Sequence, residues 1–366
     1  MKISVFMPLA LCLTGCSLIS PLILIPAPSS FQTRIGSNIP TSNQPCVKIQ
    51  SYNQSELSLR KNILSEAAAT FSLGNFEKLE NYYSLYKQRN SRTPSGLWKL
   101  RFFYDGLFDT DLTNYDNENS WIKVETKIRE WIKTYPQSPA PYIVYSNFLL
   151  RRGWHFRGGG FAHEIRPEAW EKFNTNIQLA KNVLEKNKEL ASVDPQWYAN
   201  MLHIARLQSW HKREVKKLLR EALSKEAYYH ETYYEVFEYL LPKWGGSFEE
   251  AEQFADDAVV ITSKCEGKGF YTRIYWRAFN EIREFHSNAF HSTPANWQKM
   301  SQSFEDIVKY YPVSWNVNSY GKFACFAGDK AKTKELLTKI GSNPIPEAWK
   351  QSGLDFSSCQ KLAFES

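Results

Sequence analysis

WIKVETKIREWIKTYP, residues 121–136, contains the apolar pattern on which the fold assignment of this chain depends. Its large apolar side chains recur every three or four residues, which places them on one stripe of an α-helix. The stripe consists of Trp121, Val124, Ile128, Trp131, Ile132 and Tyr135. Pro136 ends it, because the residue before a proline disfavours the helical conformation. The segment therefore predicts an amphipathic helix that buries one face.

The same spacing recurs later in the chain. Two further stripes are Phe173, Ile177, Ala180 and Leu184, and Trp297, Met300, Phe304, Ile307 and Val308. Helix-start signals agree with them, since Asp194 precedes Pro195, and Ser247 precedes Phe248 with Glu250 close behind. No convincing run of alternating β-branched residues intervenes, so the sequence predicts an all-α fold.

Three short segments look like the turns of helical hairpins, with a glycine, a capping residue and then the start of a second helix. They are GNFEKL at 74–79, GSFEEA at 246–251 and GDKAKT at 328–333. Pro136 and Pro312 precede Gly153 and Gly328 by 17 and 16 residues, close to half of a 34-residue tetratricopeptide repeat. We expect a degenerate tetratricopeptide-like α-solenoid of helical hairpins over residues 51–366, with a compact helical bundle as the alternative.

The N-terminus has the parts of a secretory signal, a short positive region followed by an apolar region. The tetrad Leu13-Thr14-Gly15-Cys16 resembles the bacterial lipobox, in which a diacylglyceryl thioether forms on the cysteine before cleavage. The resemblance implies a lipoprotein signal peptide over residues 1–15, cleavage between Gly15 and Cys16, and lipid on Cys16. Ser17, rather than Asp, follows the cysteine, which in Gram-negative lipoproteins implies sorting to the outer membrane.

An uncleaved membrane anchor is the alternative interpretation of the N-terminus. Val5 to Ile25 would give a span near the ~20 residues of a transmembrane helix. Pro8 and Pro21 argue against it. We expect a protein that is lipid-anchored in the cell envelope, at the outer membrane and facing the periplasm, and that meets the membrane through its lipid.

Residues 16–50 contain five prolines among Ser, Asn and Thr, and are predicted to form a flexible tether. The rest of the 366-residue chain, at 43% hydrophobic and 15% aromatic residues overall, has ample material for a core. The net charge of +7 is mild for this length, and the densest basic run, at 212–220, reads as a solvated helix face. No nucleic-acid partner is expected.

Several local patterns between residues 120 and 350 carry a family resemblance. They are Arg152-Gly153-Trp154 with Arg157-Gly158, Trp170 with Phe173, Asp194-Pro195 with Trp197-Tyr198, LPKWGGS at 241–247 with Phe254, Tyr271-Arg273-Tyr275-Trp276, and Phe323-Ala324-Cys325 with Ala327-Gly328-Asp329. The chain thereby resembles uncharacterised bacterial lipoproteins with a tetratricopeptide-like domain of unknown function. The resemblance implies a helical repeat fold and brings no catalytic residue with it.

A glycine-rich insertion at 154–166 is too rich in glycine to be helical and too aromatic to be a plain linker. Loops on a rigid scaffold often carry function, so we expect ligand-facing residues here. The candidates are Arg152, Trp154, Arg157, His163 and Glu164, together with Trp244.

The insertion lacks the spacing of known chemical motifs. Gly158–Gly160 is not followed by the Lys and Ser/Thr of a phosphate loop, and His155, His163 and Glu164 lack the helical spacing of a zinc site. No nucleophile signature occurs elsewhere. We expect no catalytic residue, metal or cofactor, and favour a non-enzymatic interaction scaffold with an envelope or periplasmic protein as partner. An envelope hydrolase with its site in the insertion is the alternative.

Four cysteines follow Cys16, and in an oxidising compartment they allow three pairings. Cys325 and Cys359 are 34 residues apart, one repeat length, which is compatible with a disulfide between stacked helices. Buried free thiols are the alternative.

Overall fold

The computed structural model describes residues 35–47, 53–108, 117–282, 285, 290, 293–349 and 355–365. Within these ranges the chain forms helices and no β-strand, apart from an isolated bridge between Arg92 and Trp98. The prediction of an all-α fold is therefore confirmed. The expected signal peptide and the lipidated Cys16 lie outside the described residues. None of the described helices combines the length and apolar character needed to cross a bilayer.

The helices have the following bounds in chain order. They are α1 (Glu56–Ser72), α2 (Phe76–Tyr86), α3 (Lys99–Gly106), α4 (Glu118–Thr134), α5 (Ala140–Arg157), the 3₁₀ turn η3 (Ala162–Glu164), α6 (Pro167–Lys186), α7 (Lys188–Ala191), α8 (Pro195–Leu207), α9 (Lys212–Lys225), α10 (His230–Tyr239), the 3₁₀ turn η4 (Pro242–Trp244), α11 (Phe248–Glu266), α12 (Gly269–Glu281), α14 (Trp297–Tyr310), α15 (Ser314–Phe326), α16 (Lys330–Ile340), α17 (Pro346–Trp349) and α18 (Phe356–Phe364).

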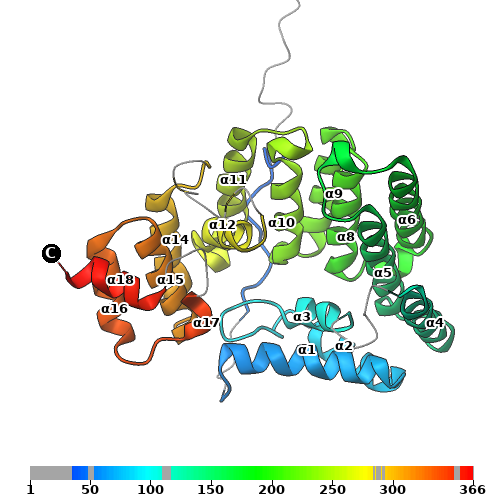
Figure 1. The fold of residues 1–366 in the computed structure, drawn as a ribbon, viewed down its shortest axis with the longest axis horizontal. Coiled ribbons are helices and arrows are strands. Elements are labelled where there is room, and N and C mark those ends of the chain that lie inside the picture. The colour runs from blue at the N-terminus through cyan, green and yellow to red at the C-terminus, as the bar shows by residue number, and fades with distance from the viewer. Residues whose placement is uncertain are drawn as a thin grey trace, which may run out of the picture.

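From α5 onward, helices pack in consecutive pairs that follow one another along a curved row (Figure 1). The pairs are α5 with α6, α8 with α9, α10 with α11, α12 with α14 and α15 with α16. Helix α8 also contacts α5 and α10, and α10 contacts α12, so neighbouring pairs share an interface. Helices α1–α3 lie beside the middle of the row: Arg101 of α3 pairs with Glu231 of α10.

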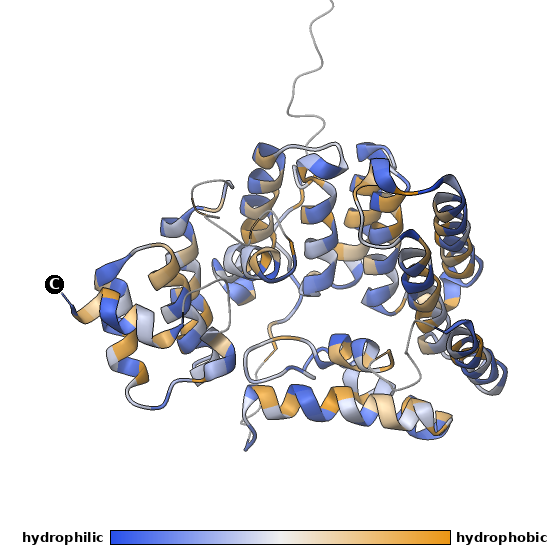
Figure 2. Ribbon diagram, in the orientation of Figure 1, coloured by the Kyte–Doolittle hydropathy of each residue, from blue (hydrophilic) through white to orange (hydrophobic). Residues whose placement is uncertain are grey.

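The predicted apolar stripes form part of the core. In α4, Trp121, Val124, Ile128 and Trp131 are buried, and the Trp131 indole donates to Glu80 Oε1 of α2 at 2.7 Å. The stripe of α6 is buried throughout, whereas in α14 Met300, Phe304 and Ile307 are buried and Trp297 and Val308 are half-buried. Figure 2 shows apolar and polar residues alternating around the helices, as expected of amphipathic helices that pack on one another.

The three predicted hairpin turns occur where the sequence placed them. The side chains of Asn75, Ser247 and Asp329 accept hydrogen bonds from the backbone three residues on and so begin α2, α11 and α16. Gly74 and Gly328 have φ angles of 69° and 74°, a left-handed conformation that glycine adopts without strain. The local sequence therefore determines these reversals.

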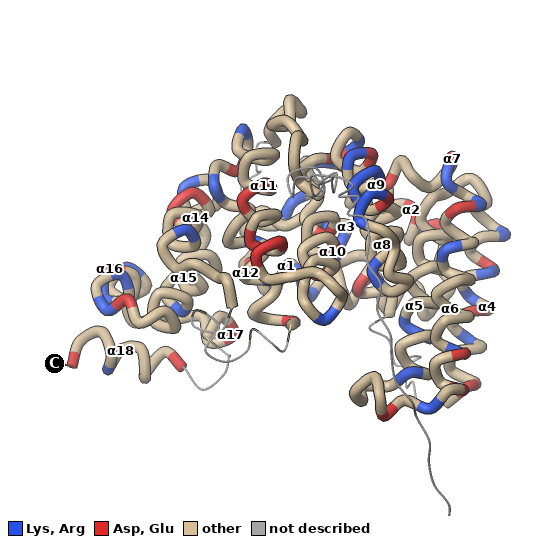
Figure 3. Tube along the Cα trace, turned by 90° about the horizontal axis from the view of Figure 1, so that it is seen from above, with Lys and Arg blue, Asp and Glu red and all other residues tan. Residues whose placement is uncertain are grey.

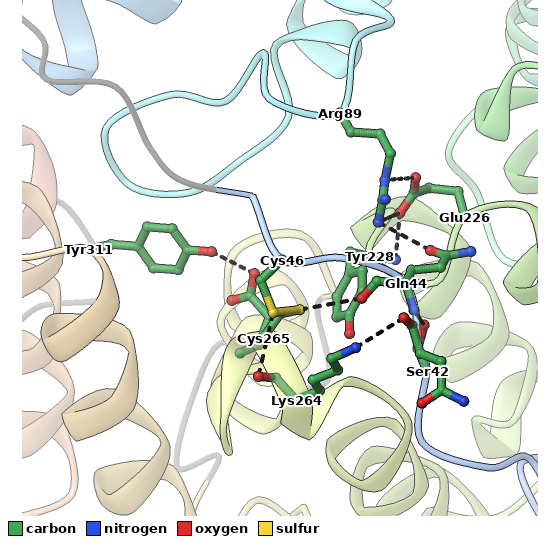
Figure 4. Close-up of a disulfide and its surroundings, with 11 residues drawn as sticks. Ser42, Gln44, Cys46, Arg89, Glu226, Tyr228, Lys264, Cys265 and Tyr311 are labelled. Atoms are coloured by element: carbon green, nitrogen blue, oxygen red, sulfur yellow. Dashed lines mark hydrogen bonds and ion pairs between the residues drawn. A yellow bond between two sulfur atoms is a disulfide. The ribbon is translucent and has the colours of Figure 1, made fainter.

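The second half of the expected flexible tether is ordered, so that prediction is wrong for residues 35–47, which we name the strap. The strap lies along α11 and α9 (Figure 4). Ser42 N donates to Ile261 O at 2.8 Å, and Gln44 Nε2 donates to Lys225 O at 3.2 Å. Ile35, at its start, is 3% exposed. Contacts made more than 180 residues away order this segment, and local composition does not show them.

Two disulfides close the fold. Cys46 in the strap joins Cys265 in α11, and Cys325 in α15 joins Cys359 in α18. For the second pair, the sequence was compatible with either a disulfide or two buried free thiols, and the structure has the disulfide. The first pair was not foreseen, because it depends on the path of the strap.

Charged residues of both signs are interspersed along most helices (Figure 3). The basic run of α9 is partly used within the fold. Lys216 Nζ donates to Ser37 Oγ at 2.7 Å, Arg220 donates to the Ser37 carbonyl, and Lys212 pairs with Glu250. Lys216 and Arg220, which belong to the helix face predicted to be solvated, therefore bind the strap.

Candidate functional site

The insertion differs from its expected form in its first half. Residues 154–157 are the last turn of α5, so the prediction that they are non-helical is wrong. Helix α5 continues to Arg157 and ends there, because the next residue, Gly158, has a φ of 71° and makes the turn out of the helix. Only residues 158–166 form the connection to α6, and it contains the short turn η3.

The candidate arginines at the insertion make structural contacts. Arg152 pairs with Glu118 and Glu125 and so joins α5 to α4. The Arg157 guanidinium lies 5.2 Å from the Trp154 ring centre and 5.0 Å from that of Trp170. It also donates to the carbonyls of Gly158 and Gly160, which shapes the loop. Both guanidinium groups thus hold neighbouring elements in place.

The remaining candidates do not converge on one site. His163 stacks on Phe161, and the Glu164 carboxylate accepts from Phe161 N at 2.8 Å, which caps η3. Both His163 and Glu164 are exposed. Trp244 lies in η4 against Arg206 of α8, with the guanidinium 5.0 Å from its ring centre. Within the described ranges, no group of three His, Cys, Asp or Glu side chains is arranged to hold a metal ion.

A cavity of about 140 Å³ lies where α1–α3 meet the row of helix pairs. Helices α10, α12 and α15 of the row and helices α1 and α3 contribute to its wall. Its lining consists of Arg60, Leu97, Arg101, Phe102, Tyr234, Arg273, Trp276, Arg277, Asn280, Glu281 and Trp315. Four arginines around one small cavity make it the most unusual site in the described part of the chain.

Two of these arginines pair with carboxylates that do not line the cavity. Arg60 Nε lies 2.5 Å from Glu56 Oε1, and Arg101 Nη1 lies 3.0 Å from Glu231 Oε1. Glu56 also accepts from the backbone and hydroxyl of Ser95 at 2.7 and 2.8 Å. Burial lowers the pKa of Arg60, whereas Glu56 opposes that change. The Arg101–Glu231 pair joins α3 to α10 of the row, whereas the Arg60–Glu56 pair lies within α1 and Glu56 ties α1 to Ser95.

The two arginines of α12 are held differently. Arg273 is 3% exposed, and its Nη2 donates to the Ser95 carbonyl at 2.5 Å. Arg277 pairs through Nε with Glu281, one turn on in the same helix. Arg273 Nε and Arg277 Nη1 are buried without a hydrogen-bond partner among the described residues. Residues that line the cavity therefore contain guanidinium N–H groups that the surrounding protein does not satisfy.

Aromatic rings form the apolar part of the wall. Trp276 and Trp315 are stacked with their ring centres 6.4 Å apart, and the Arg60 guanidinium lies 5.1 Å from the centres of Phe102 and Trp315. The Trp315 Nε1 atom is also buried without a partner in the described part of the chain. Such cation–π contacts hold the side chains of the wall in place.

Acidic groups near the cavity are shifted toward their neutral forms. Burial raises the pKa of Glu231 to about 8, although Arg101 opposes this change. Burial also raises the pKa of Glu281 to about 7, again against Arg101. The Glu281 side chain is 44% exposed, so water moderates this effect at the cavity mouth. Both carboxylates nevertheless lie within ion-pair distance of Arg101, which favours their charged forms.

The sequence did not single out this site. Arg60, Arg101, Arg273 and Arg277 come from three helices that meet only in the folded chain. One available signal was Arg273 between Tyr271 and Ile274, because a charge within an apolar helix face indicates a buried, partnered group. Arg273 also belongs to the resemblance motif Tyr271-Arg273-Tyr275-Trp276, for which the resemblance implies no role.

Comparison with family models, curated proteins and solved structures yields no match to this chain.

Proposed function

We propose that this protein is a lipid-anchored lipoprotein of the bacterial cell envelope whose helical domain serves as a protein-interaction scaffold. The observation that carries the proposal is the pair of disulfides, Cys46–Cys265 and Cys325–Cys359. Disulfides persist in oxidising compartments and are rare in the cytosol. They are what an exported domain requires, and the lipobox at residues 13–16 supplies the route of export and the anchor.

We further propose that the curved row is a degenerate tetratricopeptide-like solenoid. Support comes from the consecutive helix pairs, the shared interfaces of α5, α8, α10 and α12, and the glycine turns before α11 and α16. The position of α1–α3 beside the middle of the row departs from a simple solenoid, in which each repeat contacts only its neighbours. A partner would therefore meet the outer surfaces and edges of the row.

An open groove supports the scaffold role. It has a volume of about 810 Å³ and lies between α6 and the turn from α8 to α9, with Gln178, Leu179, Leu207 and Trp210 among its lining residues. Leu179 is 46% exposed there. Exposed apolar side chains in a groove are a common feature of partner-binding surfaces.

The anchor is tested by metabolic labelling with a fatty acid. Label is expected on the wild-type protein and absent from Cys16→Ala, because that thiol is the expected attachment atom. Label on the variant, or none on the wild type, would contradict the anchor.

The scaffold is tested by placing a photo-crosslinking residue at Leu179 in cells. We expect a discrete covalent adduct with an envelope protein. The matched control is the same residue at Leu73, which is 82% exposed in the turn between α1 and α2. Adducts that are the same from both positions, or that are absent from Leu179, would remove the support for this surface.

A further inference from the structure

We propose that the cavity between α1–α3 and the row binds a small organic anion that carries one carboxylate and a flat apolar group. Its donors are Arg273, Arg277 and Trp315. The proposal concerns the folded domain alone. It does not depend on lipid anchoring or on a protein partner.

The first argument is that the unsatisfied buried atoms are hydrogen-bond donors and not acceptors. Arg273 Nε, Arg277 Nη1 and Trp315 Nε1 are buried donors without a partner among the described residues, and all three residues line the same cavity. None of the acceptor atoms of the lining residues is left in this state. A buried unsatisfied donor costs about 1–3 kcal/mol, and a ligand acceptor would recover much of that cost. We therefore expect the ligand to carry a hydrogen-bond acceptor.

The second argument is the charge of the wall. Four guanidinium groups line the cavity, whereas Glu281 is the one carboxylate among the lining residues. Glu281 pairs with Arg101 and Arg277. Glu56 pairs with Arg60, and Glu231 pairs with Arg101 and lies 4.0 Å from Arg277, but neither Glu56 nor Glu231 lines the cavity. The planar guanidinium fork matches a carboxylate with two parallel hydrogen bonds. An anionic acceptor is thus favoured over a neutral one.

The third argument is size and shape. An apolar cavity of about 150 Å³ takes one benzene molecule, so the volume of about 140 Å³ admits a ligand with a single small ring or branched chain. Phe102, Trp276 and Trp315 give the cavity aromatic walls. Inorganic phosphate would meet the donors but leave these walls uncovered. A small carboxylate with an apolar group fits both parts.

The test is a titration of the full-length protein in detergent with benzoate, followed by calorimetry and by intrinsic tryptophan fluorescence, to which Trp276 and Trp315 contribute. Benzamide is the neutral isostere, and inorganic phosphate is the anion without an apolar group. We expect saturable binding of benzoate and at least tenfold weaker binding of both comparison compounds. Equal binding of benzoate and benzamide, or no saturable binding of benzoate at millimolar concentration, would overturn the proposal.

Three variants locate the binding in the cavity. Arg277→Gln should weaken benzoate binding at least tenfold, and Trp315→Phe should weaken it several-fold while keeping the ring. Glu281→Gln should strengthen binding, because it removes the carboxylate that pairs with Arg277. The control Arg213→Gln changes an exposed arginine of α9 and should have no effect. Benzoate affinity that is unchanged in Arg277→Gln would also overturn the proposal.

Two controls keep these results interpretable. Circular dichroism and the melting temperature show whether each variant is folded, and Glu281→Gln supplies a gain of affinity that misfolding does not produce. Cys16→Ala should bind benzoate as the wild type does. A failure of lipidation and a failure of anion binding are therefore distinguishable.

Discussion

Cys46 and Cys265 are 219 residues apart in the sequence, and their Cα atoms lie 5.2 Å apart. The bond between them joins the strap to the last turn of α11 (Figure 4). The second disulfide, Cys325–Cys359, closes a sequence separation of 34. A cross-link removes more entropy from the unfolded chain when its loop is longer. The two disulfides are therefore expected to contribute unequally to stability.

Replacing each pair by serine tests this inequality. The chain-entropy relation gives about 5 kcal/mol for loss of Cys46–Cys265 and about 4 kcal/mol for loss of Cys325–Cys359. Urea unfolding of Cys46→Ser/Cys265→Ser and of Cys325→Ser/Cys359→Ser measures both values. A larger loss from the shorter loop would show that local packing, rather than loop entropy, controls the effect.

Gln44 is one of the polar residues that fasten the strap to α9, together with Ser37. Its Nε2 donates to the carbonyls of Ser224 and Lys225, and its Oε1 accepts from Ala227 N at 2.9 Å. Gln44→Glu replaces the donor by a charge that faces two carbonyls, so we expect faster hydrogen exchange across the strap and a loss of about 1–3 kcal/mol. Asn43→Asp adds the same charge at an exposed position and should leave exchange unchanged. Equal exchange in both variants would contradict this role of Gln44.

Asp194 provides a prediction about pH. It caps α8, accepts from Tyr104 OH at 2.6 Å, and is 1% exposed. Burial raises its pKa to about 6, so between about pH 4 and 6 the folded state holds more protons than the unfolded state. Stability contributed by this group is present below pH 4 and falls by about 3 kcal/mol as the pH rises through that window. Asp194→Asn keeps the cap and should remove this fall in thermal unfolding curves.

Asp355 is the matched control for Asp194, because it also caps a helix but is exposed. Hydrogen bonds from Ser358 lower the pKa of Asp355, so its contribution is present above the usual carboxyl pKa and is lost as the pH falls. Asp355→Asn should therefore change the pH dependence in the opposite direction. The same sign of change in both variants would contradict burial as the cause.

Gly106 controls the approach of α3 to α1. A Cβ at this position would lie 2.6 Å from Leu64 O and 2.8 Å from Leu64 Cα, both in the backbone of α1. Gly106→Ala must push the helices apart and should cost about 1–3 kcal/mol in chemical unfolding. Gly159→Ala is the control, since nothing lies within 4 Å of its Cβ, and its change should stay within about 0.5 kcal/mol. A neutral Gly106→Ala would mean that α1 and α3 move apart freely.

Features set by neighbouring residues were predictable from the sequence. The stripe on α4, the cap at Ser247 and the glycine turn at Gly328 each depend on residues within a few positions of one another. The all-α class follows from the sum of such signals. The end of α5 differs from the prediction because the three glycines at 158–160 affect only the residues that follow Arg157, while the residues before them stay helical.

Features set by residues far apart in the chain were not predictable. The strap has the composition of a linker, and it is ordered by α9, α11 and Cys265. The arginine cavity forms only because α1 and α3 pack beside α10, α12 and α15, which are far away in the sequence. Arg152 and Arg157 are predicted to face a ligand because they flank a loop. In the structure Arg152 pairs with Glu118 of α4, and Arg157 packs on Trp170 of α6. A charge pattern alone does not separate arginines that bind a ligand from those that join helices.

The strap also has a consequence for the order in which the chain folds. Solenoid repeats can fold one after another, because each depends only on its neighbours. Here residue 46 is made early, and its partner in α11 comes 219 residues later, so the N-terminal part must wait for the centre of the domain. Contacts of such long sequence separation slow folding. The strap, although it is made early, would therefore be among the last segments to reach its final place.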